Sequence, residues 1–271
     1  MVALPRGRRR GMTMVELLLA VAIMAMVAGT MGILARGMQQ SYQYTQGYGT
    51  ATQHARVVLE RIERTIREAT TSDEFPGAIA VAEMVDAWRF PEILVVWHPS
   101  GDPVDPDGLP RFNELVIYCP NLNAPNQLIE LTVPSDGRIV PPVTNRPQWR
   151  AEIGAIRQTN AGNSISLSEL VRTCAVEDAA AGSVLSMAAV RFETRLRPSQ
   201  DEWDDYQNGD VAWEDLAWVQ GICGSQTGMR QVWVRAEVQL TPQAASIAED
   251  SATNKPVPFF GSESINYELH R

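Results

Sequence analysis

An uncharged apolar run from Leu17 to Ala35, closed by Arg36, constrains this chain more than any other feature. The run is nineteen residues long. A bilayer core about 30 Å thick requires roughly 20 apolar helical residues. With the preceding residues as its first turns, the segment is long enough to cross a membrane as one helix. We therefore expect a membrane-spanning helix over residues 12–35.

The flank before this run is basic and predicts the orientation of the helix. It holds four arginines and no acidic residue: Arg6, Arg8, Arg9 and Arg10. Because basic flanks stay in the cytoplasm, everything after Arg36 is expected outside it. A cleavable secretory signal would have an apolar region of about 7–15 residues and a small-residue cleavage site. This run is longer, and no clean pattern of that kind closes it.

One carboxylate, Glu16, stands at the start of the apolar run. A plain signal anchor would explain the arginines and the length of the run, but not this residue. A carboxylate in a membrane segment is costly and suggests a function by default. Its burial is tolerable when an opposite charge pairs with it. Glu16 is therefore a candidate functional residue.

The stretch GMTMVELLLA, residues 11–20, resembles the prepilin processing site of type IV pilins and type II secretion pseudopilins. The resemblance implies cleavage after Gly11 and methylation of Met12, a first mature position that is commonly Phe. Thr13 becomes the second mature residue and Glu16 the fifth. It further implies that Glu16 pairs with the N-terminal amine of a neighbouring subunit during filament assembly.

The resemblance also implies partners and a location. The partners are other pilin or pseudopilin subunits, the prepilin peptidase and an inner-membrane assembly platform. The location is the bacterial inner membrane, as a single-pass protein with a cytoplasmic N-terminus, a periplasmic domain and later a place in a filament. Four of the 23 basic residues lie in the leader, which leaves 19 against 32 acidic residues, a balance of −13. We expect no nucleic-acid partner, because that would need a basic face.

The sequence predicts an α+β protein of the pilin-like type, with a long N-terminal helix packed on an antiparallel β-sheet domain. We divide it into a basic leader (1–11), a transmembrane or filament-core helix (12–35), an amphipathic continuation (36–72), a periplasmic β-rich domain (73–241) and an irregular tail (242–271). The continuation repeats apolar residues at three- and four-residue spacing, as one helix face requires. These residues are Ala51, Ala55, Val58, Ile62, Ile66 and Ala69.

Short apolar runs separated by turn residues predict the strands of the β-rich domain. The last two alternate apolar and polar residues, which favours an antiparallel sheet with one wet face. A helix is possible at 166–175. The best predicted strands are 92–98, 113–119, 127–133, 187–196 and 230–240.

No residue pattern supports catalysis. The three histidines, His54, His98 and His270, lack the spacing of a metal site or a nucleophile relay. Hydrolase, metalloprotease, phosphate-loop and dithiol motifs are absent from the sequence. We therefore predict no enzyme activity, no catalytic residue, no cofactor and no metal site.

Three sets of residues leave alternatives open. Cys119, Cys174 and Cys223 permit one disulfide in an oxidising envelope, but spacing does not identify the pair, and three unpaired thiols are an equal alternative. The acidic loop 101–114 is a stiff surface loop or a calcium site, and the acidic segment 201–210 is a solvated insertion, a calcium site or a contact surface. The tryptophans are partner contacts or core residues: Trp203, Trp213 and Trp218.

The size of the β domain and its late strands resemble the J-type minor pseudopilin of type II secretion, with the W-type minor pilin of type IV pili close behind. We therefore expect a minor pseudopilin that supports protein export. A minor pilin of a type IV pilus or DNA-uptake filament is the alternative within the family. A signal-anchored envelope binding protein or enzyme is the alternative from another class.

Overall fold

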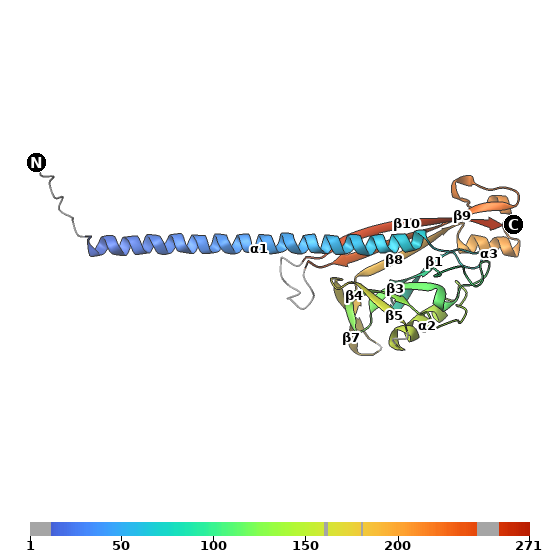
Figure 1. The fold of residues 1–271 in the computed structure, drawn as a ribbon, viewed down its shortest axis with the longest axis horizontal. Helices are drawn as coiled ribbons and strands as arrows, with labels where there is room; N and C mark the ends of the chain where they lie inside the picture. The colour runs from blue at the N-terminus through green and yellow to red at the C-terminus, as the bar shows by residue number, and fades with distance from the viewer. Residues whose placement is uncertain (1–11, 160–161, 180, 243–254) are drawn as a thin grey trace, which may run out of the picture. The chain divides into compact units, whose positions relative to one another are not determined.

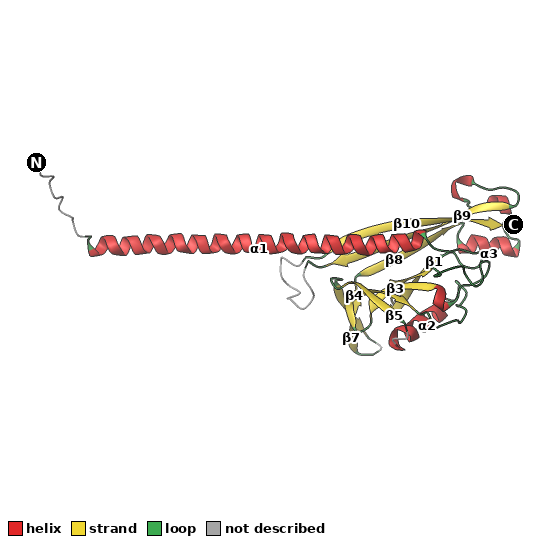
Figure 2. Ribbon diagram, viewed as in Figure 1, coloured by secondary structure: helices red, strands yellow, loops and turns green. Residues whose placement is uncertain are grey.

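A computed structural model describes residues 12–159, 162–179, 181–242 and 255–271. The chain divides into two compact units, Met1–Gln46 and Gly47–Arg271. Helix α1 (Met14–Arg67) is followed by antiparallel sheets (Figure 1), which confirms the predicted α+β class. Figure 2 shows that strands are the main regular secondary structure after α1.

In the first unit, the described residues belong almost entirely to α1, and their apolar side chains face outward. Leu17, Leu18 and Leu19 are 55%, 61% and 62% exposed. Among the residues described, α1 alone is long and apolar enough to cross a membrane, a finding that rests on length and composition. The predicted apolar run therefore forms a helix with no protein packed over it.

The helix ends at Arg67, before the predicted end at residue 72. The backbone N–H of Thr70 donates to the carbonyl of Trp97, and that of Ser72 donates to the carbonyl of Phe75. The chain thus leaves the helix because these backbone groups pair with the sheet and with the following loop.

The second unit contains a five-stranded antiparallel sheet whose strands follow chain order. The side chains of its second and third strands are largely buried on both faces, which accounts for the continuous apolar run at 93–97. The strands are β1 (Ala78–Val85), β2 (Trp88–Trp97), β3 (Leu115–Asn121), β4 (Ala124–Thr132) and β5 (Asn163–Ser168).

A three-stranded antiparallel sheet has the order β10-β9-β8, and a separate hairpin pairs β6 with β7. Its strands are β8 (Val190–Arg197), β9 (Thr227–Leu240) and β10 (Val257–His270), and the hairpin consists of β6 (Thr173–Asp178) and β7 (Ser183–Ala188). The remaining helices are α2 (Arg146–Thr159), α3 (Gln200–Asn208), η1 (Phe112–Glu114), η2 (Trp213–Asp215) and η3 (Val219–Gly221).

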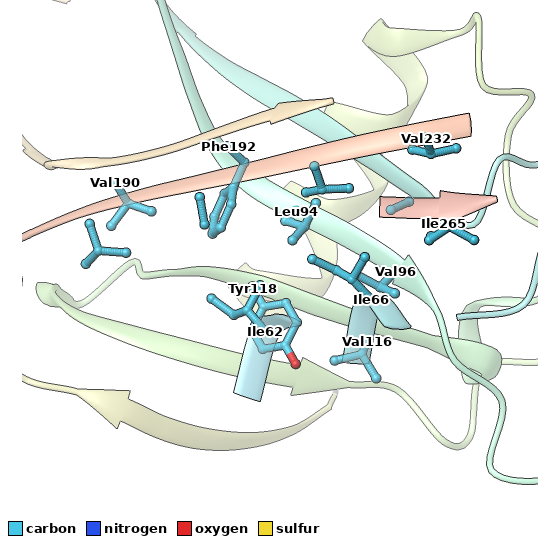
Figure 3. Packing of buried hydrophobic residues seen from close by; sticks show 14 of the residues in the cluster. Ile62, Ile66, Leu94, Val96, Val116, Tyr118, Val190, Phe192, Val232 and Ile265 are labelled. Carbon is cyan, nitrogen blue, oxygen red and sulfur yellow. The ribbon is translucent and has the colours of Figure 1, made fainter. Parts of the chain in front are cut away.

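The main core of this unit lies between the last turns of α1 and both larger sheets. Figure 3 shows Ile62 and Ile66 of α1 among side chains of the five-stranded sheet, including Leu94 and Tyr118, and of the three-stranded sheet, including Phe192. The predicted apolar face of the helix is confirmed for Ala51, Ala55, Val58, Ile62 and Ile66, which are buried, whereas Ala69 lies beyond the end of α1 and is partly buried.

A second core covers the opposite face of the five-stranded sheet. Ile79, Ile93 and Val95 point into it from the strands, and Trp149 and Ile153 point into it from α2. The indole N–H of Trp149 donates to the carbonyl of Pro142 at 3.2 Å, which satisfies the one polar group of this side chain. The sheet is therefore stabilised by burial on both sides.

Two predictions about the fold were wrong. The region 242–271 is not an irregular tail throughout, because β10 pairs with β9 along all 14 of its residues and buries Ile265, Tyr267 and Leu269. The possible helix at 166–175 is instead the end of β5, a connecting segment and the start of β6. There, Val171 donates its backbone N–H to Asn126, so pairing with the sheet region replaces the helix.

The tryptophans of the 201–218 segment are core residues. Trp203, Trp213 and Trp218 are 6%, 1% and 3% exposed. Their rings contact each other, with centroids 6.3 Å apart for Trp203–Trp213 and 4.6 Å apart for Trp213–Trp218. Burial leaves them no surface for a partner, so the core interpretation holds.

Candidate functional site at the start of the apolar helix

The described members of the predicted processing and assembly residues lie at the start of α1 or just before it. Gly11 is outside the described residues, whereas Met12, Thr13 and Glu16 are described. Met12 is 65% exposed and precedes the helix. The structure therefore places the residue after the predicted cut on an accessible, non-helical segment.

Thr13 and Glu16 form a reciprocal cap. The backbone N–H of Thr13 donates to Glu16 Oε2 at 2.9 Å, and the Thr13 hydroxyl donates to the same oxygen at 3.0 Å. In return, the backbone N–H of Glu16 donates to Thr13 Oγ1 at 3.3 Å. This is the capping box, in which a Thr and a Glu three residues later satisfy each other's backbone donors.

This geometry leaves part of the carboxylate available. Both bonds that Glu16 accepts end on Oε2, and Oε1 has no hydrogen-bond partner within the part of the chain described. Glu16 also lies in the first turn of α1, where the helix dipole favours negative charge. The residue can thus cap its own helix and still accept a bond from a cation outside it.

The capping role is one that the sequence interpretation missed. The spacing of Thr13 and Glu16 is the threonine-x-x-glutamate pattern that marks a helix start, and it would have identified the cap. The roles of Gly11 and Met12 in processing, and of Thr13 and Glu16 in assembly, stay predictions.

In each acidic loop, one carboxylate has a structural role. In the 101–114 loop, Glu114 is 5% exposed, and its carboxylate accepts backbone N–H bonds from Val104 at 2.7 Å and Arg111 at 2.8 Å. The 201–210 segment is largely helix α3, capped by Ser199 and Glu202. Across the described parts of the chain, no three or more His, Cys, Asp or Glu side chains cluster as a metal site would require.

The cysteines and histidines do not form a further site among the residues described. Cys119 is buried, Cys174 and Cys223 are exposed, and all three are unpaired. His98 Nε2 lies 3.3 Å from Glu68 Oε2, a surface contact at the end of α1. These side chains are dispersed over the second unit.

One strongly perturbed carboxyl, that of Glu92, lies in the interior beside α2. Arg157 Nη1 lies 2.9 Å from Glu83 Oε1, but its Nη2 lies 3.6 Å from Glu92 Oε1. Glu92 Oε2 has no partner in the structure. Burial is the main cause that raises the pKa of Glu92 from 4.5 to about 7. The cluster therefore holds one more carboxyl than its arginine fully pairs.

Glu92→Gln is expected to stabilise the protein at neutral and higher pH. Because the folded-state pKa of Glu92 is raised, its stability contribution is fully present below about 4.5 and is lost as pH rises to about 7. The variant should therefore gain about 1–3 kcal/mol in unfolding free energy above pH 7.

Urea unfolding at about pH 4.5 and about pH 8 checks this difference. Glu83→Gln is the matched control, because it removes the shorter contact with Arg157 and should destabilise the protein. An equal stability of wild type and Glu92→Gln at the higher pH would contradict the assignment.

The motif is also found by comparison with known proteins. A family model for the prokaryotic N-terminal methylation motif matches residues 6–32, which include the leader arginines, Gly11 and Glu16. No curated protein and no solved structure matches the chain. The chain therefore carries a prepilin-type N-terminal motif on a long apolar helix, which supports a type IV pilin-like or pseudopilin protein.

Proposed function

We propose that this protein is a minor pseudopilin of a type II secretion pseudopilus, processed after Gly11 and methylated on Met12. The observation that carries the proposal is the match of residues 6–32 to the methylation motif, directly before an apolar helix. Prepilin peptidase and other pilin-type subunits are the partners that such a motif implies. The large β domain supports a minor subunit of the J type, with the W-type minor pilin as the nearest alternative.

The apolar helix holds the subunit in the inner membrane before assembly. The leader arginines keep the N-terminus in the cytoplasm, so the β domain lies in the periplasm. On assembly the helix moves into the filament core. There the Glu16 carboxylate leaves water, and it needs a cation to offset the loss of hydration. The amine that cleavage creates on Met12 of a neighbouring subunit supplies that cation.

The protein acts by assembly and contact, without catalysis and without a cofactor. The apolar helix anchors the subunit, and its Glu16 sets the axial position of the subunit in the filament. The β domain selects the neighbouring subunits. A minor pilin of a type IV pilus or DNA-uptake filament would use the same motif. The neighbouring genes distinguish the two systems. A secretin gene with a single secretion ATPase gene would indicate type II secretion, whereas a retraction ATPase gene or competence genes would indicate a type IV pilus or DNA-uptake filament.

The proposal is tested by the mass of the N-terminal peptide, after expression with and without a prepilin peptidase. We expect a peptide that begins at N-methylated Met12, and only when the peptidase is present. Gly11→Val should block the cut, because the site requires a glycine before it. Gly7→Val, which changes a leader glycine outside the cut, is the matched control and should be processed. An intact leader, or a cut at another residue, would favour a signal-anchored envelope protein.

A further inference from the structure

Arg146 is placed where a cation is unfavourable. It is the first residue of α2, at the positive end of the helix dipole. Its side chain is partly buried, and Nη1 donates to the carbonyl of Ala80 at 3.2 Å. No described carboxylate lies within ion-pair distance of it. Burial, followed by repulsion from Arg89, lowers the pKa of the Arg146 guanidinium.

Arg89, the second residue of β2, adds to this unpaired charge. It is exposed and, like Arg146, has no described ion-pair partner. The chain as a whole has an excess of acidic residues, 32 against 23 basic ones. Arg89 and Arg146 are therefore two neighbouring arginines that no carboxylate of the described residues neutralises. Residues that break a local electrostatic rule are candidates for function.

Both arginines, together with Arg191 of β8, line one cavity of about 700 Å³. Its wall beside them is apolar, with Phe90 and Pro91 from β2 and Met187 from β7. Two carboxylates, Glu193 and Glu237, also line the cavity, so it does not carry positive charge throughout.

Those two carboxylates already have partners. Glu193 Oε1 lies 2.6 Å from Arg195 Nη2. Glu237 faces Arg191 in the β8–β9 register and accepts from the Gln239 side chain at 3.4 Å. The uncompensated charge is thus confined to the Arg89 and Arg146 side of the cavity.

We propose that this cavity binds a carboxylate, supplied by an acidic side chain of a partner protein. Arginines bind carboxylates with paired, charge-assisted hydrogen bonds. Although Glu193 and Glu237 have partners, they still lower the positive potential of the cavity, which favours a singly charged carboxylate over a phosphate. The apolar wall suits the neighbouring side chains of a peptide. The inference does not depend on the N-terminal motif, and its failure would leave the proposed function untouched.

The test is calorimetric titration of the full chain in detergent at low salt. The probes are a blocked Leu-Glu-Leu peptide, its Leu-Gln-Leu counterpart, glutarate and inorganic phosphate. We expect the Glu peptide to bind at least about tenfold more tightly than the Gln peptide, which lacks the charge. It should also bind more tightly than glutarate, which lacks the apolar neighbours, and than phosphate.

Arg146→Gln and Arg89→Gln should each weaken binding of the Glu peptide by about tenfold. Arg150→Gln is the matched control. It lies one turn along α2 and donates to the carbonyl of Ala82 at 2.9 Å, but it does not line this cavity. The affinity of the Arg150→Gln variant for the Glu peptide should equal that of the wild type. Melting temperatures without ligand verify that each variant is folded.

Several results would overturn the proposal. Equal binding of the Glu and Gln peptides, no saturable binding of the Glu peptide, or an equal loss in Arg150→Gln would each exclude the site. Tighter binding of phosphate or glutarate would exclude a partner's side chain as the ligand. If Arg146→Gln does not fold, Arg89→Gln still decides the result, because that side chain is exposed.

Discussion

Glu16→Gln is expected to lower incorporation into filaments at least about tenfold, while cleavage after Gly11 continues. The glutamine retains an oxygen that can accept the cap bonds from Thr13 but carries no charge. If Glu16 pairs with a neighbouring subunit's amine in an apolar filament core, removal of that charge leaves the amine buried and unpaired. The measurement is the ratio of processed subunit in sheared filaments to that in the membrane.

Thr13→Ala is the matched control for this experiment. It removes the two bonds that involve the Thr13 hydroxyl but keeps the backbone bond to Glu16 and the carboxylate charge. Loss of a helix cap costs about 1 kcal/mol, so assembly should fall far less than in Glu16→Gln. Equal incorporation of Glu16→Gln and wild type would show that the carboxylate serves the cap alone.

Arg61→Met is expected to lower the free energy of unfolding by about 2–4 kcal/mol. Arg61 of α1 binds Glu130 of β4 through two bonds of 2.8 Å each. The side chain of Glu130 is 5% exposed, whereas that of Arg61 is 50% exposed. The variant therefore leaves a buried carboxylate with only the Tyr118 hydroxyl, at 3.2 Å, as a described donor. Urea unfolding of the full chain in detergent measures the loss.

The pH dependence of the same pair gives an independent check. The Arg61 guanidinium lowers the pKa of Glu130 below its ordinary value of 4.5. The pair's stabilisation is thus present above that value and is lost as pH falls through the folded-state pKa. Arg61→Met should lose this acid dependence, and Arg61→Met/Glu130→Gln should recover part of the stability. A double variant no more stable than Arg61→Met would argue against the buried charge as the cause.

The elements that depend on residues close together in the sequence were predicted correctly. The apolar face of α1 follows from helix spacing, and the strands predicted at 92–98, 113–119, 127–133 and 230–240 overlap β2, β3, β4 and β9. The strands β1, β5, β6 and β10 were not predicted. Of these, β10 contains Pro258, Gly261 and several polar residues, a composition typical of a loop. It forms because a distant strand supplies its hydrogen bonds and its alternate side chains reach the core.

The same distinction applies to the candidate sites. Thr13 and Glu16 are three residues apart, so their spacing is visible in the sequence. Arg89 and Arg146 lie on β2 and α2, and only the packing of α2 on the sheet brings them to one cavity. No sequence pattern relates them, because each is an isolated arginine on its own element.

The burial of Ala51, Ala55, Val58, Ile62 and Ile66 determines where the chain can be shortened for solution work. These side chains belong to α1 by sequence but to the main core of the second unit by packing. A soluble form that starts near Gly47 would keep all of them. One that starts after Arg67 would expose the apolar surfaces of both sheets to water, and it would be prone to aggregate. A soluble truncated form should therefore begin within α1, well before the end of this helix.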